Sequence, residues 1–406
     1  MSQESPSFLP PVSLVTSAEE TAHTLFTAAL AAELPVALWR LPFTQEVQVL
    51  VASRVEPELP PLEGPQKGFA FCPFSISATS PINFLPADLY FSGKADAELE
   101  FGNNLLPARF KPVFQKTGSK QKQEQAWPSH PDGLPKAITR DAFEQTVATA
   151  VKAMQAGCLE KVVLSRTKTL SLFEGFDLLS AFTQLTQLYP NAFISLVAIP
   201  GVGTWLGASP EVLVQIDRHH VFKTVALAGT QPLTDGLTPA DAIWRQKEIE
   251  EQALVQRYII SCFKHLRLRD YVEMGPRTMA AGNLLHLRTD YSAAMEEVGF
   301  PELGTQMLEL LHPTSAVGGM PKASALHMIQ ELELHDRRYY SGYLGPVQLG
   351  QETNLFVNLR CVELGQDTVT AYAGAGMTPD SNPAKEWQET ELKMQTVLRL
   401  FQASES

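Results

Sequence analysis

Two helical stretches of the sequence carry glutamates on the side that also carries apolar residues. In the first stretch, Glu248 and Glu251 share the apolar side, because successive residues of a helix are rotated by about 100°. In the second, Glu386 and Glu389 lie beside an apolar stripe, with Lys393 close to them. Carboxylates on an apolar face destabilise a fold unless a cation neutralises them. Because carboxylate oxygens suit Mg²⁺ and no His or Cys is near, the pattern predicts a magnesium site.

A solvent-exposed arrangement of the same residues is the alternative. Lys247 and Glu251 are four residues apart, as are Glu389 and Lys393. Pairs with this spacing form weak ion pairs on exposed helix faces. Helix geometry alone leaves both interpretations open.

Two further ionisable residues stand at the ends of predicted strands. Lys161 opens the apolar run KVVLSR, and apolar surroundings lower the pKa of an amine and make it a usable base. Glu211 follows GASP at the start of another strand. Taken singly, Lys161 is interpreted more simply as a strand-end lysine with a hydrated ammonium group, and Glu211 as an edge carboxylate.

Anion binding is predicted at two other places. Arg360 lies inside a strand between apolar neighbours, where a guanidinium usually has a carboxylate to bind. In the run AGAG (373–376), small residues let backbone N–H groups approach an anion, although a tight turn explains the run equally well. His312 fits either a helix end or a loop. The residues alone thus predict an α+β protein with a magnesium and carboxylate-binding site, and no particular reaction.

Consecutive strand-like runs predict an antiparallel sheet in the middle of the chain. The runs AFISLVAI, TWLGA, EVLVQI and HVFKTVALA follow one another with turn signals between them. Helices are expected over about 19–34, from Asp141 with Glu144 as a capping-box partner, and over about 241–265, 322–334 and 383–401. Strands in runs followed by helices favour α+β over a Rossmann-type sheet.

A polar, Pro- and Lys-rich stretch at 111–135 has no hydrophobic periodicity and is predicted to be a linker. It separates an N-terminal α/β portion, 1–134, from a larger portion, 135–406, which we expect to carry the catalytic residues. We expect the two portions to form one structural unit.

The composition argues against several classes of partner. The formal net charge is −12, whereas nucleic acid and anionic membranes require basic patches. Four scattered cysteines without CxxC spacing fit free thiols in a reducing cytosol. The sequence shows no signal peptide and no run of roughly 18 apolar residues. We therefore expect a cytoplasmic protein that binds neither nucleic acid nor membrane.

Nine segments, in this order, resemble the chorismate-binding enzyme family, which includes isochorismate synthases, salicylate synthases, anthranilate synthase large subunits and aminodeoxychorismate synthases. The segments are EKVVLSR (160–166), GASPEVLV (207–214), ALAGT (226–230), KEIEEQALV (247–255), LLHPTSAVGG (310–319), ELELHDRRYYSG (331–342), NLRC (358–361), YAGAGM (372–377) and EWQETELK (386–393). Nine ordered segments are more specific than any single motif. The N-terminal third resembles the family only loosely.

The resemblance implies a bilobed fold in which two large antiparallel sheets pack together and are flanked by helices. It also implies that Glu251 and Glu389 bind Mg²⁺ directly, with Glu248 and Glu386 behind them. The substrate would be chorismate. The residues that the resemblance places around it are Gly229, Thr230, His312, Arg360, Tyr372, Gly374, Gly376 and Lys393.

The resemblance implies a reaction as well. Family members that add water have a lysine where Lys161 stands, and aminodeoxychorismate synthases commonly carry a nucleophilic lysine where Ala228 stands. The first lysine is present here and the second is absent. This implies an isomerase, isochorismate synthase, in which Lys161 activates water for attack at C2 while Glu211 protonates the departing C4 hydroxyl. Its product would feed menaquinone or siderophore biosynthesis, and the enzyme would be a monomer or homodimer.

Three alternatives remain. A salicylate synthase would go on to eliminate pyruvate, an ammonia-dependent synthase would work with a glutaminase subunit, and a non-catalytic module would only bind chorismate. Two residues depart from the family pattern. Gln252 stands where the family usually has histidine, and Lys385 where it usually has glycine. A lysine at 385, if near the metal, would weaken Mg²⁺ binding.

Overall fold

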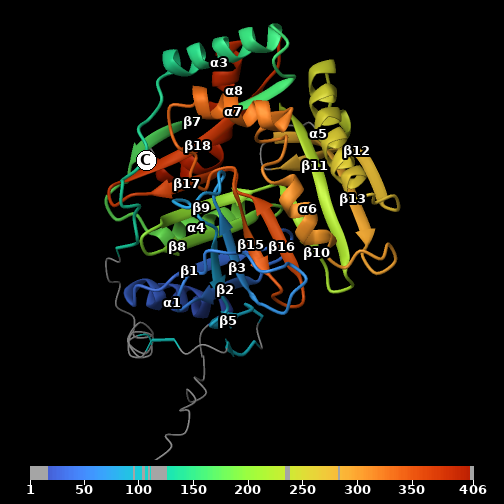
Figure 1. Ribbon diagram of the computed structural model, residues 1–406. Coiled ribbons are helices and arrows are strands. Elements are labelled where there is room, and N and C mark those ends of the chain that lie inside the picture. Colours follow the sequence, from blue (N-terminus) through green and yellow to red (C-terminus); the bar gives the residue numbers. More distant parts are fainter. Residues whose placement is uncertain are drawn as a thin grey trace, which may run out of the picture.

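The computed structural model describes residues 17–94, 97–102, 106–107, 110, 126–233, 238–281 and 284–402. Most of the predicted linker, 111–125, lies outside them. In the described part, two antiparallel sheets pack together and helices cover their outer faces (Figure 1). The predicted α+β class with two large antiparallel sheets is confirmed.

The larger sheet has ten strands among the described residues. In spatial order they are β14 (Gly319–Met320), β7 (Lys161–Ser171), β18 (Thr368–Met377), β17 (Cys361–Leu364), β9 (Gly203–Ser209), β8 (Phe193–Ile199), β1 (Val36–Arg40), β2 (Val47–Val51), β5 (Leu89–Phe91) and β6 (Glu100–Phe101).

The smaller sheet has eight strands within the same described ranges. Their spatial order is β12 (Val272–Ala281), β13 (Leu284–Ala294), β11 (Val221–Pro232), β10 (Val212–Ile216), β16 (Thr353–Val357), β15 (Tyr343–Val347), β3 (Gly68–Cys72) and β4 (Asn83–Pro86).

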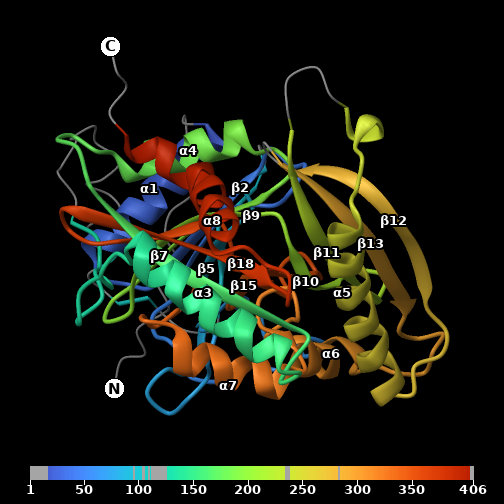
Figure 2. The same ribbon diagram turned by 90° about the horizontal axis from the view of Figure 1, so that it is seen from above.

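Helices lie on the outer side of each sheet. They are α1 (Ala18–Ala31), α3 (Arg140–Gln155), α4 (Leu178–Leu188), α5 (Gln246–His265), α6 (Leu303–Leu311), α7 (Lys322–Leu332) and α8 (Pro383–Leu398), with 3₁₀ turns at Pro239–Asp241 and Arg399–Phe401. Helices α1 and α4 lie together on the larger sheet, whereas α5 covers the smaller one (Figure 2). No helix among the described residues combines the length and hydropathy of a membrane span.

Aromatic rings fill the space between the sheets. Phe193 on β8 and Phe356 on β16 stack with their ring centres 4.2 Å apart. Trp39 on β1 and Phe69 on β3 lie 5.1 Å apart, and all four side chains are buried. Such pairs contribute about 0.5–1.5 kcal/mol beyond the burial of their area. They fix the position of one sheet relative to the other, and any site between the sheets requires this.

The N-terminal strands belong to both sheets. Strand β1 pairs with β8 along its whole length, and β3 pairs with β15. Since β8 and β15 lie far along the chain, residues before the predicted linker help to build the two sheets that also contain the segments resembling the family.

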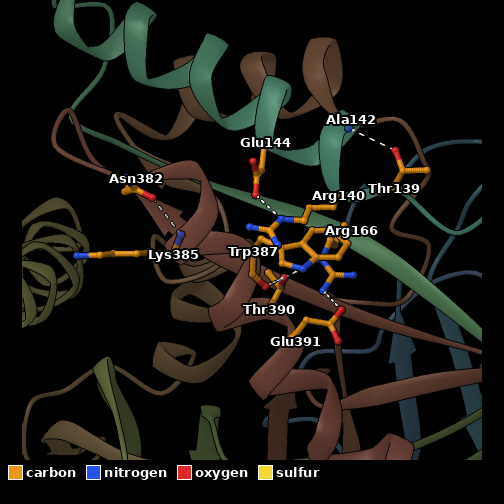
Figure 3. Close-up of polar contacts among 10 residues, drawn as sticks. All are labelled: Thr139, Arg140, Ala142, Glu144, Arg166, Asn382, Lys385, Trp387, Thr390 and Glu391. Atoms are coloured by element: carbon orange, nitrogen blue, oxygen red, sulfur yellow. Dashed lines mark hydrogen bonds and ion pairs between the residues drawn. The ribbon is translucent and has the colours of Figure 1, made fainter.

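The cap of α3 and the start of α5 differ from the prediction. In α3 the cap is Thr139, whose Oγ1 accepts from the backbone N–H of Ala142, while Glu144 accepts from Arg140 Nε at 2.7 Å instead of capping the helix (Figure 3). Helix α5 begins at Gln246 rather than 241, after the separate 3₁₀ turn. Helices α4 and α6 were not predicted, because short apolar runs do not distinguish a helix from a strand.

Two adjacent connections cross from one sheet to the other. The chain passes from β9 in the larger sheet to β10 in the smaller one, and from β16 back to β17. The two crossings are hydrogen bonded to each other: Val357 N–H donates to the carbonyl of Glu211, and Ala208 N–H donates to the carbonyl of Arg360, both at 3.0 Å. Glu211 and Arg360 are therefore fixed at the seam between the sheets.

Candidate active site

A cavity opens at this seam. Its walls come from the two crossings, the start of β7, the end of β18, and helices α5 and α8, and its empty volume is about 770 Å³ including the part open to solvent. The predicted site residues that line it are Lys161, Glu211, Gly229, Glu251, Arg360, Tyr372, Gly374, Gly376, Glu389 and Lys393.

Lys161 is the first residue of β7 and is only 3% exposed. Burial, together with the charge of Lys393, lowers the pKa of its amine, although the carboxylates of Glu251 and Glu211 act in the opposite direction. A β-carbon added at Gly376 on the neighbouring strand β18 would lie 3.2 Å from Lys161 Cε. Glycine at this position therefore leaves the lysine side chain room to reach the cavity.

Glu211 shows the opposite shift. Burial raises the pKa of its carboxyl group to about 7, even though Lys161, Lys393 and Arg360 each lower it. Lys161 and Glu211 are thus close enough to affect each other, and each is pushed towards its neutral form. The amine is thereby made easier to deprotonate and the carboxyl group easier to keep protonated, as a base and an acid that share a cavity require.

Arg360 points to an anionic ligand. It has a left-handed backbone, φ 50°, at the crossing from β16 to β17. Its Nη1 atom is buried and has no hydrogen-bond partner among the described residues. A buried guanidinium N–H without an acceptor is costly, and a ligand carboxylate would satisfy it. Nearby, Lys393 Nζ donates to the carbonyl of Gly374 at 2.9 Å and pairs with Glu389 at 2.7 Å.

The acidic residues of the two helices pair with lysines. Glu251 on α5 and Glu386 on α8 both contact Lys247, at 3.8 and 3.2 Å, and Glu389 pairs with Lys393. Among the described residues, no group of three or more His, Cys, Asp or Glu side chains is close enough together to hold a metal ion. The predicted i,i+4 pairs therefore exist, but Glu251 and Glu389 face the cavity rather than open solvent.

The carboxylates still fit a divalent cation. Burial raises the pKa of Glu251 and that of Glu386, and in both cases the charge of Glu389 raises it further. Glu386 is 1% exposed, and its Oε2 has no hydrogen-bond partner in the described chain. Mutual repulsion and an unpartnered buried carboxylate oxygen are features that a bound cation relieves.

Four predicted site residues are not placed at the cavity wall. Glu386 is buried but does not line the cavity, and Glu248 accepts from the backbone N–H of Arg245 at the start of α5. His312 packs its ring 4.9 Å from that of Tyr343, and burial lowers its pKa to about 4. It is half-buried and does not line the cavity, so the structure does not bring it to the predicted ligand site. The side chain of Thr230 lies outside the described residues.

His286 was not predicted to belong to the site. It lies on β13 and lines the cavity, with Nδ1 2.8 Å from the carbonyl of Gly229. Burial lowers its pKa to about 3, and the nearby charge of Arg360 contributes to this shift. The ring is therefore neutral near pH 7. The only signal for it in the sequence is a histidine inside the apolar run NLLHL.

Tyr340 also lines the cavity without having been predicted. Its ring stacks on Tyr372 at 5.6 Å, and Tyr372 in turn stacks on Trp205 at 5.3 Å. Tyr372 donates its hydroxyl hydrogen bond to the buried Glu363. The aromatic wall is therefore held from behind by a carboxylate.

The opposite face of α8 is attached to β7. Arg166 is 1% exposed, lies 3.5 Å over the Trp387 ring, donates to Thr390 Oγ1 at 2.7 Å and pairs with Glu391 (Figure 3). These contacts fix the rotation of α8, so that Glu389 and Lys393 are directed at the cavity. Lys385, which departs from the family pattern, is exposed and does not line the cavity.

Comparison with known proteins identifies the family. The model of the chorismate-binding enzyme family matches residues 84–402. The chain therefore belongs to the chorismate-binding enzyme family. Isochorismate synthase EntC of Escherichia coli is 30% identical over 264 residues, which are 64% of this chain and 66% of that protein. Anthranilate synthase component 1 of Aeropyrum pernix is also 30% identical, over 64% of this chain and 60% of its own length.

The fold has solved counterparts. The structure of MenF, the menaquinone-specific isochorismate synthase from Escherichia coli, superposes with a TM-score of 0.73 at 22% identity, over 93% of this chain and 91% of that one. Sequence alignment with EntC spans just under two thirds of that relative. The likeness in structure therefore extends over more of the chain than the likeness in sequence.

The shifted carboxyl group gives a first prediction. Glu211 should titrate with a midpoint near pH 7 in infrared difference spectra, with its band identified by its loss in Glu211→Gln. In Lys161→Met the midpoint should rise, because the lysine cation lowers the pKa of Glu211 and its removal leaves burial less opposed. A midpoint near 4.5 in the unaltered protein would contradict the burial of this carboxyl group.

Proposed function

We propose that the protein is an isochorismate synthase, which converts chorismate to isochorismate. The observation that carries the proposal is the pair at the cavity: a buried amine, Lys161, whose pKa is lowered, and a buried carboxyl group, Glu211, whose pKa is raised to about 7. Adding water at one ring carbon while a hydroxyl leaves another needs such a base and such an acid at the same pH.

In the proposed reaction, Lys161 accepts a proton from water as the water oxygen bonds to C2. The ring double bonds shift, the C4–O bond breaks, and Glu211 gives its proton to the departing hydroxyl, which leaves as water. One water enters and one leaves, so the reaction is an isomerisation overall. The two residues lie on different elements, β7 and the β9–β10 crossing, which suits groups acting on different faces of a ring.

Arg360 and Lys393 would hold the enolpyruvyl carboxylate. The unpartnered Nη1 of Arg360 supports this role, as does the small-residue run of β18, which lines the cavity through Gly374 and Gly376. A β-carbon at Gly374 would lie 3.0 Å from the hydroxyl of Tyr340. Glycine there keeps the backbone open to the ligand.

We propose Mg²⁺ as the cofactor. Glu251 and Glu389 would be its direct ligands, with Glu386 and Glu248 behind them, once the ammonium groups of Lys247 and Lys393 move aside. When bound, the ion would neutralise the ring carboxylate of chorismate and orient the substrate. A dianionic substrate and a divalent cation together add no net charge to the cavity.

Two features favour water over ammonia as the nucleophile. Lys161 is present at the position where water-adding members have lysine, and Ala228, which lines the cavity, stands where aminodeoxychorismate synthases carry a nucleophilic lysine. These residues matter because the relatives with 30% identity include both an isochorismate synthase and an anthranilate synthase.

Product analysis tests the proposed activity. Protein incubated with chorismate and Mg²⁺ should yield isochorismate by chromatography, without stoichiometric pyruvate. Quantitative salicylate and pyruvate would instead establish a salicylate synthase. Anthranilate fluorescence that depends on ammonium would establish an ammonia user, and binding without any product a non-catalytic module.

Removing either proton-transfer group should slow the chemical step. Lys161→Ala and Glu211→Gln should each lower kcat by at least about a hundredfold while chorismate still binds, as measured by calorimetry. Lys168→Ala is the matched control, because Lys168 lies on the same strand but pairs with Glu391 outside the cavity. Turnover near the unaltered rate in either variant would refute the role assigned to that residue.

Metal binding should depend on the carboxylates that face the cavity. Glu251→Gln and Glu389→Gln should each weaken Mg²⁺ binding to the substrate-free protein by at least about tenfold, measured by calorimetric titration, and a chelator should abolish turnover. Glu250→Gln should change neither, because Glu250 is on the same helix but is exposed. Equal Mg²⁺ affinity in all three variants would exclude this site.

A further inference from the structure

Strand β7, which begins with Lys161, is incompletely paired on its outer edge. Strand β14 contributes only Gly319 and Met320, which pair with Val162 and Lys161. The N–H of Val163 still donates a hydrogen bond to the carbonyl of Gly318, at 2.9 Å. Beyond that point no strand of the described residues continues on this edge, although the carbonyl of Val163 and the N–H of Ser165 face outwards.

A buried ion pair takes the place of the missing strand. Arg337 Nη2 donates to the carbonyl of Val163 at 2.6 Å, and Glu333 Oε1 accepts from the N–H of Ser165 at 2.6 Å. Glu333 and Arg337 also bind each other through two hydrogen bonds, at 2.5 and 2.8 Å. Their side chains are 4% and 2% exposed. Acceptor and donor thus stand at the positions where a strand would offer its carbonyl and N–H.

The same guanidinium also holds the loop opposite β7. Arg337 Nη1 donates to the carbonyl of Val317 at 2.8 Å. Val163 and Val317 both line the cavity, and Lys161 is two residues before Val163. The Arg337 guanidinium therefore joins two backbone segments of the cavity wall, and one of these segments carries Lys161.

We infer that Glu333 and Arg337 are positioning residues for Lys161. By joining Val163 to Val317 and completing the edge of β7, they fix the direction in which the lysine enters the cavity. Misplacing a reacting group by about 1 Å costs on the order of a hundredfold in rate. The inference rests on the proposed function, because it assigns the pair to the chemical step rather than to substrate binding.

Arg337→Lys tests the inference while keeping the buried charge beside Glu333. A lysine has one nitrogen and cannot span the two carbonyls and the carboxylate as a planar fork does. We expect kcat to fall by at least about tenfold, with the dissociation constant for chorismate within about threefold of the unaltered value. Glu331→Gln is the matched control, since it removes an exposed pair with His327 on α7, and should change neither.

A double variant controls for the possibility that the single variant loses activity by misfolding. Glu333→Gln with Arg337→Met leaves no unpaired buried charge, which commonly preserves a fold, and should lose kcat as the single variant does. Amide exchange at Val163 and Ser165 should rise in the double variant while other strands of the sheet stay protected.

Two results separate the possible failures. If the unaltered protein forms isochorismate and both variants keep its kcat with only a lower melting temperature, the pair is purely structural and the inference is overturned. If the unaltered protein forms no isochorismate, the proposed function fails instead.

Discussion

The hydrogen bonding between two chain crossings is the constraint on which the site depends. Each crossing leaves one sheet and enters the other, and each would be free to take another path alone. Joined through the Glu211 and Arg360 carbonyls, they bring an acid and a cation to the same point of the seam. The aromatic core between the sheets keeps that seam from shifting, so the two connections hold their side chains in place.

Burial of several charges in one place then determines their chemistry. Lys161, Arg360 and Lys393 line the same cavity as Glu211, Glu251 and Glu389. Burial shifts the pKa values of Lys161, Glu211 and Glu389, but the outcome differs with the neighbouring charges. The pKa of Glu211 is raised and that of Lys161 is lowered. The charges of Lys393 and other cations lower the pKa of Glu389 and keep it ionised. One cavity thus contains a carboxyl group with a raised pKa, an amine with a lowered pKa and a carboxylate with a lowered pKa.

One side of helix α8 makes structural contacts that orient the side lining the cavity. Its contacts with Arg166 use Trp387, Thr390 and Glu391, which are one turn of the helix. Glu389 and Lys393 lie on the side of the helix that lines the cavity. Because both sets share a rigid helix, fixing one set fixes the other. Strand β7 is the common support, since it carries Arg166 on one face and Lys161 on the other.

The sequence by itself determined the family, the α+β class and the side of each helix that carries glutamates, because these follow from ordered motifs and from periods of 3.6 and 2 residues. It also indicated most of the cavity-lining residues, since the matching segments contain them. Only the tertiary structure decided that His286 lines the cavity while His312 packs against Tyr343 away from it, because the local sequence does not say which elements will pack around a histidine. The lysine partners of the carboxylates, the crossings at the seam and the ion pair on the edge of β7 were likewise decided by contacts between residues far apart in the chain, which no local pattern encodes.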